Sequence, residues 1–244
     1  MKKIFINIII ILNLLFTFCK KENNNIIKKF SIEEIEKIID KKDIYLIDTR
    51  KYSDTKLNGY IKNSILIDST HKYKEFFSQI ISKDSKLIFI TKKGNENLSM
   101  NIPKELGYSN ILGYFNFEDW ENNRKEINKI NMIKGNEISE IIKNKENIIV
   151  DTREINEYKN EGIIRNSLLI PFSKIKDEYI KIPKDKNVYF LCKVGFRGVS
   201  SLTYLKRLGY KNNLYNIDGG LVEIKKSGFN IESYNTDLWD YKKH

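Results

Sequence analysis

The chain repeats its own pattern at an offset of about 100 residues, in the same order in both halves. A period of this size indicates a duplicated domain, because solenoid repeats are only roughly 20–50 residues long. We therefore expect two domains of one fold, at 26–127 and 128–236, followed by a short tail at 237–244. The matching segments are Ile47–Arg50 with Val150–Arg153, Gly59–Ile67 with Gly162–Ile170, and Leu106–Asn110 with Leu208–Asn212.

Each half contains helical patterns that alternate with short apolar runs. Ser31 is expected to begin a helix that reaches Asp40, because Glu34 completes a capping box and isoleucines follow at helical spacing. The equivalent helix of the second half is expected over 135–144. This alternation predicts an α/β fold with a mostly parallel sheet flanked by helices on both faces, in which ligands bind at the carboxyl ends of the strands. The expected buried strands are Ile44–Ile47, Leu87–Ile90, Ile148–Val150 and Val188–Leu191, and the clearest later helix is Val199–Leu208.

The first 25 residues differ from the rest of the chain. Lys2 and Lys3 precede an apolar run at 4–18, which suits a secretory signal and is short for a transmembrane helix. Cys19 follows this run and precedes a polar stretch, so the segment resembles a bacterial lipoprotein signal, with Phe18 where a small residue is usual. The resemblance implies a lipid on Cys19 and a folded part in the cell envelope, outside the cytoplasm and anchored to a bacterial membrane. A periplasmic protein and an uncleaved helical anchor are the alternatives.

Composition narrows the classes of function. The formal net charge of +11 favours anions as ligands. The lysines are dispersed, however, and no long basic block or zinc-finger spacing occurs, so we expect no nucleic-acid partner. His71 and His244 are not in a metal-ligand spacing, and we expect neither a metal nor another cofactor. With Cys19 in the N-terminal segment, Cys192 is the one thiol of the folded part, and no intramolecular disulfide is expected.

One segment of the second half carries the chemistry. Cys192 follows an apolar strand and precedes a helix expected to begin near Gly198, which places it in a strand-to-helix loop. The N–H groups of such a loop and the N-terminus of the helix favour an anion. Lys193 and Arg197 add two full positive charges, and Gly195 gives a tight loop its backbone freedom. These features favour a reactive thiolate over a thiol. The plainer interpretation is a buried core cysteine.

The loop Cys192–Arg197 resembles the active-site loop of rhodanese-like sulfurtransferases, which has a basic residue after the Cys, then a Gly, and often an Arg at the sixth place. Asp151 and Arg153 match the Asp-x-Arg signature of that family, and Gly219 and Gly220 match its glycine pair. The resemblance covers essentially the whole second half. It implies two tandem rhodanese-like domains and a structural, supporting role for these four residues.

The resemblance also implies ping-pong covalent catalysis. Cys192 would take the outer sulfur of a small anionic donor and pass it, as a persulfide, to a thiol or to cyanide. Thiosulfate is the expected donor because the loop is basic, and 3-mercaptopyruvate is the alternative. The residues that the resemblance implies in donor binding are Lys193, Val194, Gly195, Phe196 and Arg197.

The first half resembles the same fold without the reactive residue. Thr91 aligns with the Cys position and Glu96 with the Arg position, while Phe117–Glu118 aligns with the glycine pair. Threonine forms no persulfide, and a glutamate repels an anionic donor. We therefore expect a non-catalytic first domain. In two-domain members of the family, such a copy packs against the active domain and helps to wall its site.

Two rival classes of protein share features with this chain. Cysteine phosphatases and arsenate reductases also use a Cys loop that ends in Arg, but their loop is longer than the one between Cys192 and Arg197. A non-enzymatic binding or sulfide-sensing module of the envelope would use the two domains as docking surfaces. The intact loop favours an enzyme. A persulfide assay separates the two, because a sensor takes up sulfur without turning it over.

Overall fold

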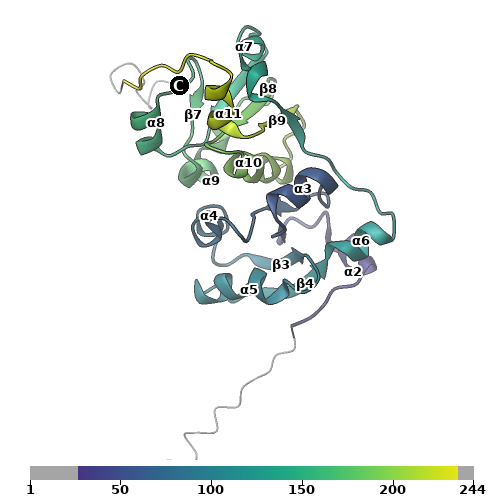
Figure 1. The fold of residues 1–244 in the computed structure, drawn as a ribbon. Helices are drawn as coiled ribbons and strands as arrows, with labels where there is room; N and C mark the ends of the chain where they lie inside the picture. The colour runs from purple at the N-terminus through teal and green to yellow at the C-terminus, as the bar shows by residue number, and fades with distance from the viewer. Residues whose placement is uncertain (1–26, 236–244) are drawn as a thin grey trace, which may run out of the picture.

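The computed structural model describes residues 27–235, which form two α/β domains (Figure 1). Cys19 and its apolar run lie outside the described residues, as does the whole tail at 237–244 with His244. Within the described part, no helix has the length and apolar character needed to cross a membrane. The first domain contains α2 (Ile32–Ile38), β1 (Ile44–Asp48), α3 (Tyr52–Asn58), β2 (Ile65–Leu66), α4 (Tyr73–Ile80), β3 (Lys86–Thr91), α5 (Glu96–Glu105), β4 (Ile111–Asn116) and α6 (Phe117–Asn122).

The second domain repeats this order and adds a strand at its start. Its elements are β5 (Asn131–Ile133), η1 (Gly135–Glu137), α7 (Ile138–Ile141), β6 (Asn147–Asp151), α8 (Ile155–Glu161), β7 (Leu168–Leu169), η2 (Phe172–Lys174), α9 (Ile175–Glu178), η3 (Tyr179–Lys181), β8 (Asn187–Leu191), α10 (Phe196–Arg207), β9 (Leu214–Ile217) and α11 (Gly220–Lys226).

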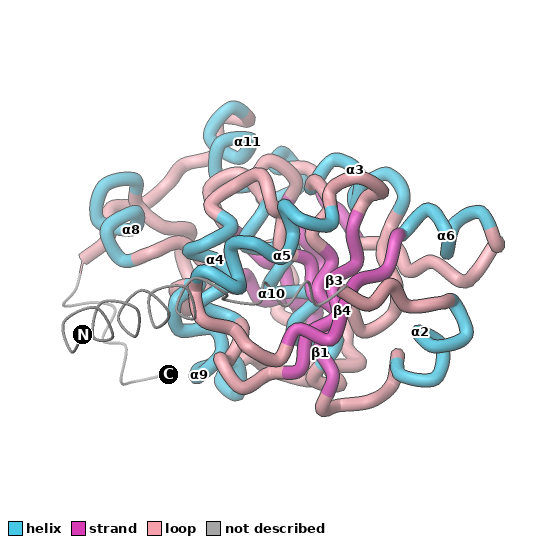
Figure 2. The backbone as a smooth tube through the Cα atoms, turned by 90° about the horizontal axis from the view of Figure 1, so that it is seen from below, coloured by secondary structure: helices cyan, strands magenta, loops and turns pink. Residues whose placement is uncertain are grey.

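Each domain is built on a parallel sheet. The strand order is β2-β1-β3-β4 in the first domain and β5-β9-β8-β6-β7 in the second, so four strands correspond and β5 is an extra edge strand. All pairings between these strands are parallel. Helices surround the strands in both halves (Figure 2). The predicted α/β fold with two tandem copies is confirmed.

The central strands are apolar because helices cover both faces of each sheet. Every residue of β3 except Lys86 is buried, and every residue of β8 except Asn187. The predicted capping box also forms: Ser31 Oγ accepts from Glu34 N–H at 3.3 Å, and Glu34 Oε2 accepts from Ser31 N–H at 2.9 Å. Apolar runs and local capping thus account for the main elements.

The helix expected over 135–144 is shorter than the sequence indicates. The chain forms the 3₁₀ turn η1 and then the single α-helical turn α7, which ends at Ile141. The side-chain oxygen of Asn144 accepts from the N–H of Glu146 at 2.9 Å, as in an Asx turn. This local bond directs the backbone toward β6 and competes with continuation of the helix.

The two domains pack through an apolar cluster to which both contribute. The Phe76 and Phe172 rings lie 5.1 Å apart. Helix α10 also bonds to the edge strand β2: Ser200 Oγ donates to the carbonyl of Leu66 at 2.6 Å, and the Leu66 N–H donates to Thr203 Oγ1 at 3.1 Å. The strand that would otherwise be an open edge of the first sheet is therefore covered by the second domain.

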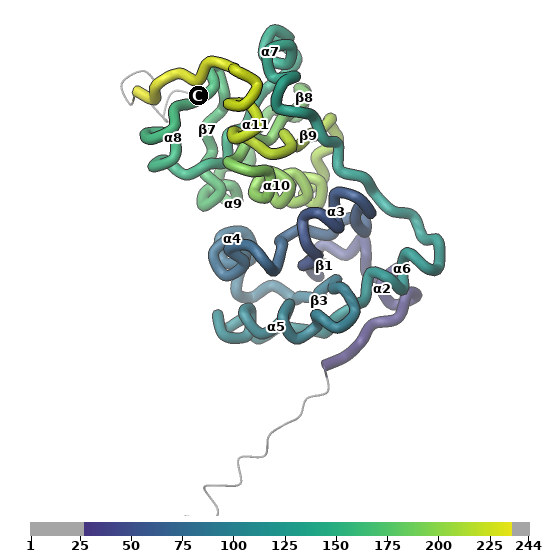
Figure 3. Tube along the Cα trace, viewed as in Figure 1, coloured from purple at the N-terminus to yellow at the C-terminus, as the bar shows by residue number. Residues whose placement is uncertain are grey.

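The connection between the domains runs along one side of the molecule, from α6 to β5 (Figure 3). Asn128 still bonds to the first domain, since its carbonyl accepts from the Tyr60 N–H at 2.9 Å. Arg207, at the end of α10, donates to the carbonyls of Lys42 and Ile44 at 2.9 and 2.7 Å. The Arg207 contacts hold the C-terminal end of α10 against the first domain, at the start of β1.

Candidate active site

Cys192 directly follows β8 and lies four residues before the first residue of α10. The helix begins at Phe196, two residues earlier than predicted, so Arg197 belongs to its first turn rather than to the loop. Gly195 has a φ of 103°, and its N–H donates to Cys192 Sγ at 3.0 Å. The thiol lies deeper than a position at the mouth of the loop suggests, because Cys192 is only 1% exposed. Val194, at 36%, and Lys193 are the exposed members of the loop.

The start of α11 holds the backbone of this loop. The N–H of Leu221 donates to the Cys192 carbonyl at 2.8 Å, and the N–H of Val222 donates to the Lys193 carbonyl at 3.2 Å. A Cβ on Gly220 would lie 2.2 Å from the Cys192 carbonyl oxygen, and the residue has a φ of 58°. Only glycine allows this approach without a shift of the backbone. Gly220 therefore lies where a supporting role requires it, whereas a Cβ on Gly219 would meet the Glu223 side chain of α11.

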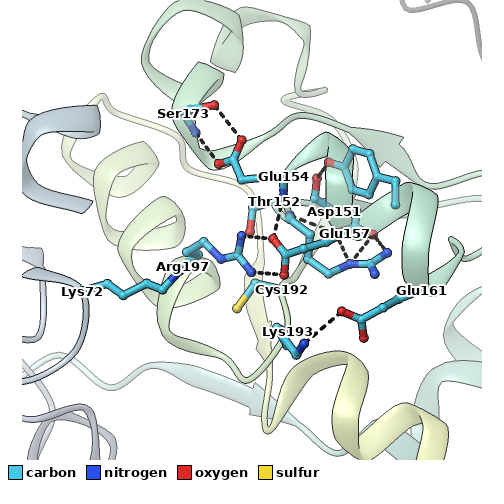
Figure 4. A network of polar contacts seen from close by, with 12 residues as sticks. Lys72, Asp151, Thr152, Glu154, Glu157, Glu161, Ser173, Cys192, Lys193 and Arg197 are labelled. Atoms are coloured by element: carbon cyan, nitrogen blue, oxygen red, sulfur yellow. Dashed lines mark hydrogen bonds and ion pairs between the residues drawn. The ribbon is translucent and has the colours of Figure 1, made fainter. Parts of the chain in front are cut away.

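Both cations beside Cys192 are paired with carboxylates of α8 (Figure 4). Arg197 makes a two-point contact with Glu157, at 2.5 Å for Nη1–Oε2 and 2.7 Å for Nη2–Oε1. Lys193 Nζ lies 3.0 Å from Glu161 Oε1. The sequence predicts two charges available to an anionic donor, whereas in the folded chain each already has a partner.

The electrostatics of the Arg197–Glu157 pair follow from burial and contact. Burial alone lowers the pKa of Arg197, but the hydrogen bond with Glu157 and the neighbouring Cys192 raise it above its ordinary value. Burial alone raises the pKa of Glu157, yet the hydrogen bond from Arg197 holds it below the ordinary range. Both groups are therefore charged at neutral pH.

Glu157 and Glu161 are functional candidates that the sequence reasoning missed. They lie one helical turn apart on α8, and Glu161 Oε2 also lies 3.5 Å from Lys225 Nζ. Their spacing of four is a signal, because such residues share one face of a helix. The sequence does not show, however, that this face turns toward the Cys192 loop.

Asp151 and Arg153 form a fully buried ion pair at the end of β6. Arg153 Nη2 lies 2.6 Å from Asp151 Oδ2 and donates to the carbonyl of Gly162 at 2.8 Å. The first domain repeats this arrangement, since Arg50 Nη2 donates to the Gly59 carbonyl at 2.7 Å and pairs with its own aspartate, Asp48. The pair occurs in the half without a reactive cysteine too, which favours a structural role.

The first domain reaches the Cys192 loop through Tyr52. Its hydroxyl donates to Asp218 Oδ1 at 3.2 Å and accepts from Asn216 Nδ2 at 3.2 Å. A Cβ on Gly195 would lie 2.8 Å from this hydroxyl. Burial and the adjacent Asp218 raise the pKa of Tyr52, so its hydroxyl keeps its proton. The first domain therefore packs against the Cys192 loop of the second domain.

Phe196 is held between two aromatic rings of the first domain. Its ring lies 4.9 Å from that of Tyr52 and 4.5 Å from that of His71, with which it stacks. Two of the predicted donor-binding residues, Gly195 and Phe196, therefore lie at the domain interface. The expected wall from the first domain forms here, and the sequence did not reveal which residues build it.

The equivalent loop of the first domain is occupied by its own carboxylates. Glu96 Oε1 accepts from the Gly94 N–H at 3.0 Å and from Asn116 Nδ2 at 2.7 Å. Glu118, at the position of the second glycine, accepts from the Lys93 N–H at 3.2 Å. Thr91 is buried at the end of β3. The backbone donors that could receive an external anion are thus partly satisfied internally.

Comparison with known proteins agrees with these features. The sequence model of the rhodanese-like domain matches residues 31–122 and 135–227. The chain is 29% identical over 103 residues to a sulfurtransferase of Allochromatium vinosum, covering 42% of this chain and 94% of that protein. It is also 29% identical over 101 residues to a tRNA uridine(34) hydroxylase of Hamiltonella defensa, covering 39% of this chain and 28% of that protein. The chain therefore aligns with only about a quarter of the hydroxylase.

A solved structure of a rhodanese-related protein from Thermoplasma volcanium is similar, with 26% identity and a TM-score of 0.39, covering 43% of this chain and 99% of that one. The two matches of the family's sequence model fall on the two halves of the internal repeat. The chain belongs to the rhodanese-like domain family and carries two copies of that domain in tandem.

Proposed function

We propose that this protein is a sulfurtransferase that carries a sulfane sulfur on Cys192. The supporting observation is the contact of 3.0 Å between the Gly195 N–H and Cys192 Sγ, in a loop between β8 and α10. A backbone donor at this distance stabilises a sulfur anion. The twelve-residue helix α10 adds the positive end of its dipole to the same point.

In the first half-reaction, the Cys192 thiolate attacks the outer sulfur of thiosulfate. A bond forms between the two sulfurs, the S–S bond of the donor breaks, and sulfite leaves with the electron pair. Cys192 then carries a persulfide anion. In the second half-reaction, cyanide or a thiolate attacks the terminal sulfur and releases thiocyanate or a new persulfide, which regenerates the thiolate.

Thiosulfate and 3-mercaptopyruvate are the two candidate sulfur donors for this site. Thiosulfate is a dianion and suits a loop that contains Lys193 and Arg197. 3-Mercaptopyruvate carries a carboxylate and a thiol, and requires a proton transfer that thiosulfate does not. We favour thiosulfate because the loop is basic and carries Arg197.

The test is a sulfur-transfer assay on the full-length protein with each donor. We expect sulfite and thiocyanate from thiosulfate with the wild type, and neither product with Cys192→Ser. Intact mass measurement should show one added sulfur atom on the wild type. If donor-treated protein never carries that sulfur, the sulfurtransferase function is excluded.

A sulfide-sensing module is the second candidate, and the low exposure of Cys192 favours it. A thiol with little access to acceptors would hold a persulfide rather than pass it on. The same assay distinguishes the two functions. A sensor releases at most one sulfite per protein, whereas an enzyme continues through many cycles.

We also propose, from the sequence of the first 25 residues, that the protein is lipid-anchored in the cell envelope through Cys19. The measurement is fractionation of cells that express the wild type or Cys19→Ser. Release of only the variant from the membrane would support the proposal. Equal membrane retention of both would instead indicate an uncleaved helical anchor.

A further inference from the structure

The cations that the second domain places around Cys192 are balanced by its own carboxylates. Figure 4 shows the pairs of Arg197 with Glu157 and of Lys193 with Glu161. Coulomb attraction for an incoming anion is reduced when each cation already faces an opposite charge. An anionic sulfur donor therefore needs positive charge from another source.

Lys72 of the first domain extends toward Arg197 in the same view (Figure 4). It immediately precedes α4 and has a left-handed backbone, with φ 46° and ψ 33°. Non-glycine residues adopt this conformation uncommonly, and it costs roughly 1 kcal/mol or more. Tertiary contacts must therefore hold the segment in place.

Two aromatic contacts hold the segment that contains Lys72. His71, the residue before Lys72, stacks on Phe196 of the Cys192 loop at 4.5 Å. Phe76, in the first turns of α4, packs against Phe172 of the second domain at 5.1 Å. The backbone of Lys72 is thus fixed on both sides to the domain that carries the thiol.

The charge of Lys72 is available to a ligand. Among the described residues, its partner within ion-pair distance is Glu75, with Nζ and Oε2 3.6 Å apart. Both side chains are about half exposed, at 58% and 46%. Such a surface ion pair contributes little to stability and breaks easily.

We propose that Lys72 is a donor-binding residue, contributed by the non-catalytic domain, that attracts the anionic sulfur donor to Cys192. This inference rests on the proposed sulfurtransferase function and adds one residue to its binding site. The second domain supplies the nucleophile and the backbone donors, while the first domain supplies a positive charge that is only weakly paired. The two domains together form one site.

The test compares alkylation of Cys192 by iodoacetate, an anion, with alkylation by neutral iodoacetamide, followed on the Cys192 peptide. The ratio of the two rates cancels changes in thiol ionisation. In Lys72→Gln, we expect the ratio to fall about threefold at low salt, the effect of one half-exposed charge. Lys74→Gln, an exposed lysine of α4, is the matched control and should leave the ratio unchanged.

Steady-state kinetics with thiosulfate give the second measurement. We expect Lys72→Gln to raise KM roughly tenfold, because thiosulfate carries two charges, with kcat nearly unchanged. Lys72→Arg should restore KM. An unchanged alkylation ratio, or a thiol that neither reagent reaches, overturns the inference. A lowered ratio in a protein that transfers no sulfur would remove the proposed function and leave Lys72 only as a residue that attracts anions to Cys192.

Discussion

Arg197 and Glu157 form a two-point ion pair beside the thiol, with nitrogen–oxygen distances of 2.5 and 2.7 Å. The arginine comes from the first turn of α10 and the glutamate from the first turn of α8. Geometry of this kind orients the guanidinium and limits its freedom. The role of Arg197 is thus set by a carboxylate 40 positions earlier in the chain.

Replacement of that carboxylate should cost stability in a pH-dependent manner. Because the pKa of Glu157 is lowered in the folded protein, its contribution is present above the ordinary value of 4.5 and is lost as pH falls through the folded pKa. We expect Glu157→Gln to lower the free energy of unfolding by about 1–3 kcal/mol at pH 7.

Urea denaturation at pH 7 and pH 4 measures this difference, which should shrink at the lower pH. Glu140→Gln is the control, since Glu140 pairs with Lys143 on the surface and its side chain is 79% exposed. Its replacement should have little effect at either pH. A Glu157→Gln protein as stable as the wild type at pH 7 would contradict the expected role of the pair.

The close approach of α11 to the Cys192 loop makes Gly220 irreplaceable. Gly220→Ala combines a left-handed backbone with a methyl group 2.2 Å from the Cys192 carbonyl. Gly209→Ala is the matched control, because Gly209 has a φ of 90° and nothing within 4 Å of the added carbon. Thermal unfolding should show that the free energy of unfolding of the control falls by about 1 kcal/mol.

In Gly220→Ala, we expect the free energy of unfolding to fall by at least about 2 kcal/mol more than in the control, because the added methyl group overlaps the loop. Persulfide formation should also fall in Gly220→Ala and remain normal in Gly209→Ala. Equal effects of the two substitutions would show that the contact with the loop is unimportant.

Tyr52 should couple the first domain to the reaction. Tyr52→Phe removes the hydroxyl bonded to Asp218 and Asn216, and we expect a loss of about 1–2 kcal/mol in stability. The rate of persulfide formation should fall as well, because Gly195 lies against that hydroxyl. Stopped-flow measurement of sulfite release checks the rate.

The control for this substitution is Tyr108→Phe. Tyr108 donates to the Ile81 carbonyl at 2.7 Å inside the first domain, so its replacement should lower stability without slowing sulfite release. If both variants slow the reaction equally, the effect is one of stability alone.

The first domain should not become active through a single substitution. Thr91→Cys supplies a thiol, but Glu96 and Glu118 still accept from the loop N–H groups and repel an anion. We expect no sulfur on residue 91 in Thr91→Cys after thiosulfate treatment, measured by peptide mass spectrometry. The triple variant Thr91→Cys, Glu96→Arg, Glu118→Gly should take up sulfur. Uptake by the single variant would show that the carboxylates do not block this loop.

The fold was predictable because it depends on local patterns. Apolar runs such as Leu87–Ile90 mark strands buried on both faces, and the capping box at Ser31 marks the start of a helix. The prediction of a helix over 135–144 was wrong at its C-terminal end, since the Asn144 side chain accepts from the Glu146 N–H and this bond redirects the chain. Short helices at domain edges depend on such local competition more than on periodicity.

The amino-acid sequence by itself determined the duplication, the α/β fold and the position of the thiol, because these follow from contacts near in sequence or from a motif within six residues. Only the tertiary structure decided which charges are closely paired. Glu157 and Glu161 reach Arg197 and Lys193 only after α8 packs beside the loop, and the segment that carries Lys72 meets the loop only across the domain interface, where His71 stacks on Phe196. Electrostatic pairing depends on distance in space, and no pattern along the chain records which distant charges will meet.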